Sequence, residues 1–157
     1  MALMPVNSNN LQQGFFIWQE KKRMTKLTEV EGIGEAYAGK LISCGLMTQE
    51  QLLDLGATAL GRQTIAEESG INPKLIMNWV NRADLARVKG VGSEYADLLE
   101  NSGVDTVPEL AQRNPSNLYH KMIEVNEKKK LVRNLPSIKQ VTDWVEQAKL
   151  LGRAIHY

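Results

Sequence analysis

The chain contains an internal repeat, and this repeat limits the folds it can adopt more than any other feature does. Nine residues starting at Val30 (VEGIGEAYA) align with nine starting at Val88 (VKGVGSEYA), and five of the nine positions are identical. The same offset of 58 residues gives further identical pairs: Leu41 with Leu99, Gly45 with Gly103, Thr48 with Thr106, and Leu52 with Leu110. We therefore expect two similar units that share one fold.

A second run of matches indicates an insertion in the second copy. At an offset of 65 the apolar residues Ile76, Trp79, Val80, Ala83 and Leu85 match Val141, Trp144, Val145, Ala148 and Leu150. The second copy has therefore gained seven residues in its middle. We expect them at the basic stretch 128–133, which has no counterpart in the first copy. An insertion in one copy of a repeat is expected in a surface loop or an extended helix end.

The spacing of apolar residues predicts helices throughout both copies. Thr48, Thr106, Asn72 and Ser137 precede such segments and are expected helix N-caps. Gly45 and Gly103 are placed to end helices in the left-handed conformation. No segment alternates in polarity as a half-buried strand would. The predicted fold is all-α, with two pseudo-symmetric repeats packed as one compact unit and joined by a long helix from about Asn72 to Ala83.

The predicted organisation has three parts. Residues 1–26 form a flexible N-terminal extension, 27–86 the first repeat and 87–157 the second. The extension carries Phe15, Phe16 and Trp18 before the basic triplet 21–23, and these residues form either a docking peptide or a flexible leader. Met24 resembles a natural start.

Composition favours a cytoplasmic protein. Of 157 residues, 43% are hydrophobic and 24% are charged, which is typical of a soluble globular domain. Cys44 is the only cysteine, so neither an intrachain disulfide nor a thiolate zinc site can form. The longest apolar stretch, 15–18, is far shorter than the roughly 20 residues that span a bilayer. We expect no membrane contact and no cofactor.

Two glycine pairs occupy corresponding positions in the repeat, in Gly32-Ile33-Gly34 and Gly90-Val91-Gly92. Glycines allow a tight turn between two helices, with backbone angles that strain other residues. The central Ile33 or Val91 is expected to point inward and anchor the turn. Alanine follows at 38 and 96, where paired helices must approach closely. Each copy is therefore predicted to contain a hairpin between two short helices.

These hairpins resemble the helix-hairpin-helix motif. From about Leu27 to Leu151 the chain also resembles a bacterial family of tandem helix-hairpin-helix domains that is classed as a domain of unknown function. The likeness is carried by the stretches 30–34, 79–85 with 90–92, 112–115 and 135–137. The family resemblance implies no particular activity.

The wider helix-hairpin-helix class implies a DNA-binding mechanism. In that class the backbone N–H groups of the hairpin and of the following helix start contact a DNA phosphate. Two such hairpins can hold both strands without reading base sequence. The contacts implied for this chain are Gly32, Ile33, Gly34, Gly90, Val91 and Gly92.

Charge distinguishes the two hairpins. Glu29, Glu31 and Glu35 flank the first, and carboxylates repel phosphate. The second is flanked by Arg87, Lys89 and Ser93, although Glu94 follows. We therefore expect non-sequence-specific DNA binding, chiefly through the second hairpin. The residues expected to assist it are Lys89, Ser93, Lys128, Lys129, Lys130 and Arg133.

Other interpretations remain open. The basic stretch could be a solvated helix face balanced by Glu124 and Glu127. The alternative function is a protein-interaction adaptor in which the hairpins are purely structural, and the acidic first repeat motivates it. His120 and His156 show no spacing typical of a catalytic triad, so an enzyme is not expected. Duplex DNA or a protein is the expected partner, with no small-molecule substrate and no metal.

Overall fold

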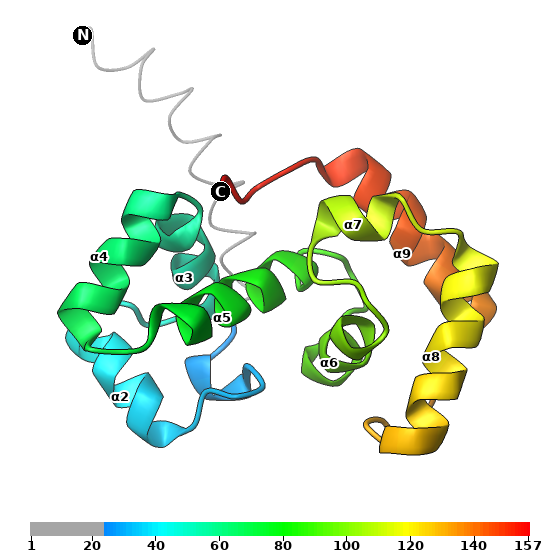
Figure 1. Ribbon diagram of the computed structural model, residues 1–157, viewed down its shortest axis with the longest axis horizontal. Helices are drawn as coiled ribbons and strands as arrows, with labels where there is room; N and C mark the ends of the chain where they lie inside the picture. The colour runs from blue at the N-terminus through cyan, green and yellow to red at the C-terminus, as the bar shows by residue number, and fades with distance from the viewer. Residues whose placement is uncertain (1–23) are drawn as a thin grey trace, which may run out of the picture.

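A computed structural model describes residues 24–157, and this part of the chain is helical (Figure 1). It contains a short 3-10 turn and eight α-helices: η1 (Leu27–Glu29), α2 (Glu35–Ser43), α3 (Gln49–Gly56), α4 (Ala59–Ser69), α5 (Pro73–Leu85), α6 (Ser93–Asn101), α7 (Val107–Ala111), α8 (Pro115–Lys129) and α9 (Ile138–Leu151). The predicted all-α class is confirmed for these residues. The aromatic and basic residues of the N-terminal extension lie outside the described residues.

Buried side chains form two separate hydrophobic clusters, and α5 connects them. Figure 1 shows α2, α3 and α4 on one side of the molecule and α6 to α9 on the other, with α5 crossing between. The first cluster contains Ile76 and Trp79 of α5, whereas Leu85 at the end of the same helix belongs to the second cluster. We expect a long joining helix over about 72–83. Helix α5 is that helix, and its C-terminal end lies two residues beyond the predicted one.

The predicted helix starts and ends are present. The side chains of Thr48, Asn72 and Ser137 each accept a hydrogen bond from a first-turn N–H, at 3.1, 2.9 and 3.1 Å. Such caps satisfy amides that have no partner within the helix. Gly45 and Gly103 follow α2 and α6 with φ of +87° and +94°. These local signals therefore fixed the boundaries of the helices.

Two tryptophans hold the hairpins onto the cores. Trp79 on α5 and Trp144 on α9 are 2% and 1% exposed. Each ring lies near a tyrosine of its own half, with centroids 5.1 Å apart for Tyr37 and Trp79 and 5.2 Å apart for Tyr95 and Trp144. Both tryptophans are therefore core residues, as their matched positions predicted.

The predicted insertion falls at the end of α8 and in the segment that follows. Helix α8 has 15 residues where α4 has 11. Residues 130–137 then connect α8 to α9, whereas only residues 70–72 connect α4 to α5. Lys130 turns the chain here with φ of +52°. Helix α8 and the connection after it are therefore longer than α4 and its connection, and the assignment of this difference to an insertion in a repeat stays a prediction.

Both ends of the described chain are attached to the first half. The Thr25 N–H donates to Glu50 Oε1 at 2.8 Å, and the Gln49 N–H donates to the Thr25 carbonyl at 2.9 Å. Lys26 pairs with Thr48, the N-cap of α3, so residues 25 and 26, which the repeat assigned to the flexible extension, are held at the start of α3. At the other end, Ile155 is buried in the first cluster. No helix within residues 24–157 combines the length and apolarity needed to cross a bilayer.

Candidate nucleic-acid interface

The first glycine of each hairpin is required by its backbone conformation. Gly32 has φ of +93° and Gly90 has φ of +95°, values that glycine adopts and other residues rarely do. A Cβ at these positions would lie 3.2 Å from Nε1 of Trp79 and 3.0 Å from Nε1 of Trp144. Each hairpin backbone therefore packs directly against an indole ring.

The second glycine of each pair is not required by the fold. We expected both glycines to need unusual backbone angles, and this is wrong for Gly34 and Gly92. Their φ values are −86° and −91°, which any residue adopts, and no heavy atom lies within 4 Å of a Cβ built there. The absence of a side chain at these positions leaves the starts of α2 and α6 uncovered.

The starts of α2 and α6 also have no side-chain cap. Helices α3, α4, α5, α8 and α9 each begin with a side-chain oxygen that accepts a first-turn N–H. Gly34 and Gly92 cannot supply one. The N–H groups of Ser93 and Glu94 have no acceptor within residues 24–157. A helix start with free amides and the positive end of the helix dipole attracts anions.

The central residues of both hairpins are anchors. Ile33 is 3% exposed and Val91 is 5% exposed, so their side chains are buried as the motif predicted. The predicted phosphate contacts through these two residues are wrong, because their N–H groups already donate to the carbonyls of Val30 and Val88, at 3.0 and 3.1 Å.

Segments of both hairpins line one cleft of about 510 Å³. The first hairpin contributes Glu29, Val30 and Glu31, and the second contributes residues 91–94. Arg82 of α5 and Ala86, the residue that follows this helix, also line the cleft. The carboxylate-bearing residues Glu29, Glu31 and Glu94 are exposed, so the cleft carries negative charge at its edges.

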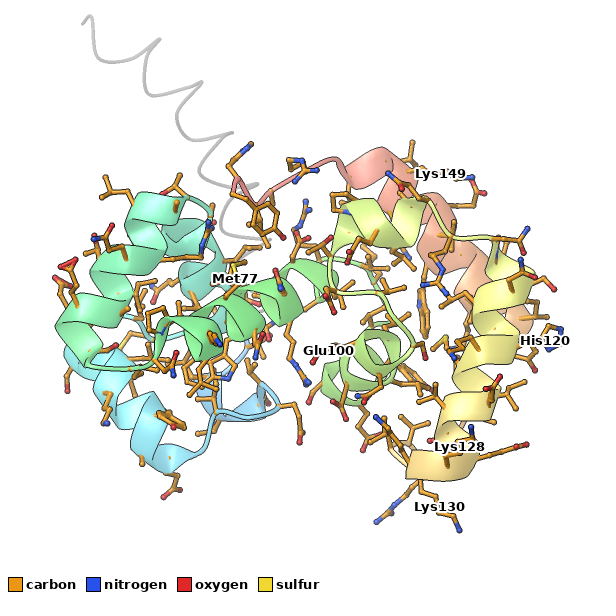
Figure 2. The ribbon with its side chains drawn as sticks, viewed as in Figure 1. Met77, Glu100, His120, Lys128, Lys130 and Lys149 are labelled. Atoms are coloured by element: carbon orange, nitrogen blue, oxygen red, sulfur yellow. The ribbon has the colours of Figure 1, made fainter. Side chains whose placement is uncertain are left out.

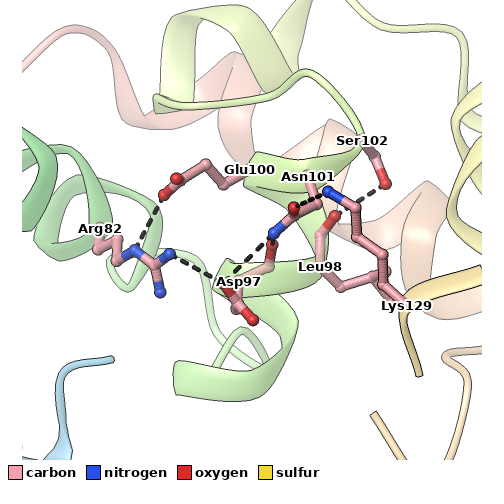
Figure 3. Close-up of polar contacts among 7 residues, drawn as sticks. All are labelled: Arg82, Asp97, Leu98, Glu100, Asn101, Ser102 and Lys129. Atoms are coloured by element: carbon pink, nitrogen blue, oxygen red, sulfur yellow. Dashed lines mark hydrogen bonds and ion pairs between the residues drawn. The ribbon is translucent and has the colours of Figure 1, made fainter. Parts of the chain in front are cut away.

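Arg82, which lines this cleft, links α5 to α6 (Figure 3). Its Nη2 lies 2.8 Å from Asp97 Oδ1 and its Nε lies 2.9 Å from Glu100 Oε2, so a residue of α5 is held by α6. Burial opposes the charged guanidinium, but hydrogen bonds and charges from these two carboxylates outweigh it and raise the pKa of Arg82. Its Nη1 is buried without a hydrogen-bond partner in the described part of the chain.

Sequence reasoning missed Arg82, although the repeat offered a signal. At the offset of 65, Arg82 corresponds to Gln147. Gln147 fixes the second hairpin: its Oε1 accepts from the Lys89 N–H at 2.8 Å, and its Nε2 donates to the Lys89 carbonyl at 3.1 Å. The first half has arginine at that place, and this arginine pairs with the other half instead. The difference between arginine and glutamine at these matched positions was therefore a sign that Arg82 contacts the other half.

The basic residues beside the second hairpin have different roles. Arg87 donates from Nε to Asp84 Oδ1 and from Nη2 to the Gly152 carbonyl, each at 2.8 Å. It therefore serves the fold and is not a free cation. Lys89 is exposed, and Ser93 is half-buried at the start of α6. Of the basic residues that remain available to a ligand, Lys89 is thus the closest in sequence to the uncapped amides of α6.

The lysines of the basic stretch lie away from the second hairpin. Lys129 Nζ donates to Asn101 Oδ1 at 2.7 Å, at the C-terminal end of α6, whereas the hairpin lies at its start. Nine helical residues separate these ends by roughly 13 Å. Figure 2 shows Lys128 and Lys130 at the far end of α8, and Arg133 is exposed. The Tyr95 hydroxyl donates to the Asn134 carbonyl at 2.9 Å, so the end of the stretch returns to the first turn of α6.

The histidines do not meet in a shared site. His120 lies on α8, with its ring 5.6 Å from that of Tyr119, and the His156 N–H donates to the Ala57 carbonyl at 2.7 Å. Across residues 24–157 no group of three or more His, Cys, Asp or Glu side chains is arranged to hold a metal.

The fold and the site define an all-α protein in which glycine hairpins precede two uncapped helices. The chain belongs to the family DUF4332, a domain of unknown function, whose family model matches residues 31–151. No solved structure matches the chain. The match confirms the resemblance to a domain of unknown function and covers most residues of both hydrophobic clusters.

Proposed function

We propose that the chain is a tandem helix-hairpin-helix unit with two halves related by approximate symmetry. Three paired observations support it. Gly32 and Gly90 share the same left-handed backbone conformation, each contacts the tryptophan of its own half, and each hairpin is followed by an uncapped helix. Independent turns would not be expected to agree in all three respects.

We further propose that this unit is a non-enzymatic module that binds duplex DNA without reading its base sequence. The observation that carries the proposal is the uncapped start of α6 behind Gly92, with open space where a side chain would be. A phosphate oxygen there would accept hydrogen bonds from backbone N–H groups, and the exposed Lys89 would add an opposite charge. Arg133 and Lys130, both exposed, are assigned secondary contacts further along the backbone.

The first hairpin contributes less to this binding. The start of α2 is uncapped too, but Glu29, Glu31 and Glu35 are all exposed around it. Their negative charges oppose the approach of a phosphate. We therefore propose that the first hairpin, through Gly32 and Gly34, makes only supporting contacts with the DNA. The second hairpin provides the main attachment.

Lys89→Glu is expected to weaken binding to a short duplex about tenfold at low salt, because a charge beside the phosphate site is reversed. The matched control is Lys149→Glu, which makes the same charge change on the exposed surface of α9. Fluorescence anisotropy with a labelled random-sequence duplex, repeated over a salt series, measures both. The salt slope should also fall by about one for Lys89→Glu alone.

Two results would count against DNA binding. One is no binding of the wild-type protein at micromolar concentration and low salt. The other is an equal loss in both variants, because that would show a diffuse charge effect with no site at the second hairpin.

A protein-interaction adaptor is the second candidate, and the acidic cleft favours it. Glu29, Glu31 and Glu94 surround a space that a basic segment of a partner protein could enter. A lysine-rich peptide should then bind the wild-type protein and bind about tenfold less tightly to a Glu31→Gln, Glu94→Gln double variant. An acidic peptide of equal length is the control. Isothermal titration calorimetry that shows equal affinities for both proteins would exclude the cleft as the docking site.

A further inference from the structure

The last six residues of the chain, 152–157, leave the second half and end on the first half; we call them the C-terminal strap. Figure 1 shows this segment running from the end of α9 to a position beside α3. The strap is not helical. Its Ile155 side chain is 2% exposed and belongs to the hydrophobic cluster of the first half. A residue that follows α9 in sequence therefore completes the core of α2 to α5.

Polar contacts hold the end of the strap on the first half. The His156 N–H donates to the Ala57 carbonyl at 2.7 Å, and Arg62 Nη2 donates to the His156 carbonyl at 3.0 Å. Arg62 also donates from Nη1 to the Gly56 carbonyl at 2.8 Å. The Tyr157 ring lies 5.6 Å from the Arg62 guanidinium. Arg62 thus contacts both the strap and the turn between α3 and α4.

The other end of the strap is fixed beside the second hairpin. Gly152 has φ of +73° where α9 ends, and its carbonyl accepts from Arg87 Nη2 at 2.8 Å. Arg87 lies three residues before Gly90 of the hairpin and is itself held by the buried Asp84. The strap therefore spans from the base of the second hairpin to the core of the first half.

We propose that the C-terminal strap is a releasable clamp that fixes the orientation of the second hairpin relative to the first. Apart from the strap, the chain crosses between the halves at the end of α5, where Arg82 pairs with Asp97 and Glu100 and Asp84 accepts from the Val107 N–H. One strap side chain is fully buried, and the remaining five residues are exposed or partly exposed. Segments with so few buried contacts open locally without global unfolding.

The consequence for binding rests on the proposed function. Two hairpins held at a fixed separation can engage one duplex together, and the second contact then benefits from a high effective concentration. Release of the strap lets the halves rotate about the end of α5, so this advantage is lost. It also removes one of the acceptors that hold Arg87.

Spin-label distances test the clamp without any DNA. Labels are placed at Lys74→Cys on α5 and Lys121→Cys on α8, two exposed positions, in a Cys44→Ser background. Ile155→Asp should broaden the distance distribution. Leu150→Asp, at a residue that is 88% exposed at the end of α9, should leave it narrow. A narrow, unchanged distribution in folded Ile155→Asp would overturn the proposal.

Native-state hydrogen exchange provides a second test, and it needs no variant. The His156 amide should exchange through a local opening, with rates that hardly depend on low denaturant concentrations. The Trp79 amide in the centre of α5 should exchange only through larger unfolding. If both amides respond equally to denaturant, the strap opens only when the protein unfolds, and the proposal is wrong even if Ile155→Asp fails to fold.

The DNA measurement is separate from these two tests. Ile155→Asp is expected to bind a long duplex at least about tenfold less tightly than Leu150→Asp does, because the two hairpins no longer act together. If the wild-type protein binds no DNA, the proposed function fails, while the distance and exchange results still decide the strap. If Ile155→Asp broadens the distance distribution but leaves the DNA affinity unchanged, the strap is a clamp. The proposed effect of this clamp on DNA binding by the two hairpins is then wrong.

Discussion

Replacing Gly90 with alanine is expected to lower the free energy of unfolding by about 2–4 kcal/mol. A left-handed conformation costs an alanine about 1–2 kcal/mol, and the φ of +95° at this position is in that unfavourable region. The new methyl group would also lie 3.0 Å from Nε1 of the buried Trp144, so the indole must shift within a packed core. Urea denaturation followed by far-UV circular dichroism measures the change.

Gly92→Ala is the matched control, two residues along the same hairpin. Its φ of −91° suits alanine and its Cβ meets no heavy atom within 4 Å, so we expect a change within about 1 kcal/mol. If the second hairpin binds phosphate through the start of α6, the same variant should still lose DNA affinity, because the methyl group stands over the free amides. Equal stability losses in both variants would contradict the assignment of different roles to the two glycines.

Replacing Asp84 with alanine is expected to destabilise the protein by about 3–5 kcal/mol, because the buried Val107 N–H and the partly buried Arg87 both lose their carboxylate acceptor. Asp84 is fully buried at the end of α5. Its Oδ2 accepts from the N–H of Val107, at the start of α7, and its Oδ1 accepts from Nε of Arg87, both at 2.8 Å. One carboxylate thus connects α5, α7 and the base of the second hairpin.

Glu146→Ala is the control for this second substitution. Glu146 pairs with Lys149 at 3.4 Å on the exposed side of α9, and exposed ion pairs contribute about 0–1 kcal/mol. Thermal and urea unfolding should therefore separate the two variants clearly. A loss below about 1 kcal/mol for Asp84→Ala would show that water replaces the carboxylate and that its connecting role is small.

The candidate site could be predicted only in part. The hairpins, their buried Ile33 and Val91, and the requirement for Gly32 and Gly90 followed from residue types at matched positions. The free lysine Lys89 followed as well. The availability of Arg87 and Lys129 could not be predicted, because their partners Gly152 and Asn101 are distant in sequence. Charge in a sequence does not reveal which cations the fold has already paired.

The sequence by itself determined the helices and many of their boundaries. Caps such as Asn72 and Ser137, the left-handed glycines, and the apolar spacing around Trp79 and Trp144 act over a few residues, so they can be recognised locally. The tertiary structure alone decided how the halves meet. Arg82 pairs with α6, both hairpins line one cleft, and Ile155 enters the opposite core, because each of these contacts depends on orientation between segments that no local pattern encodes.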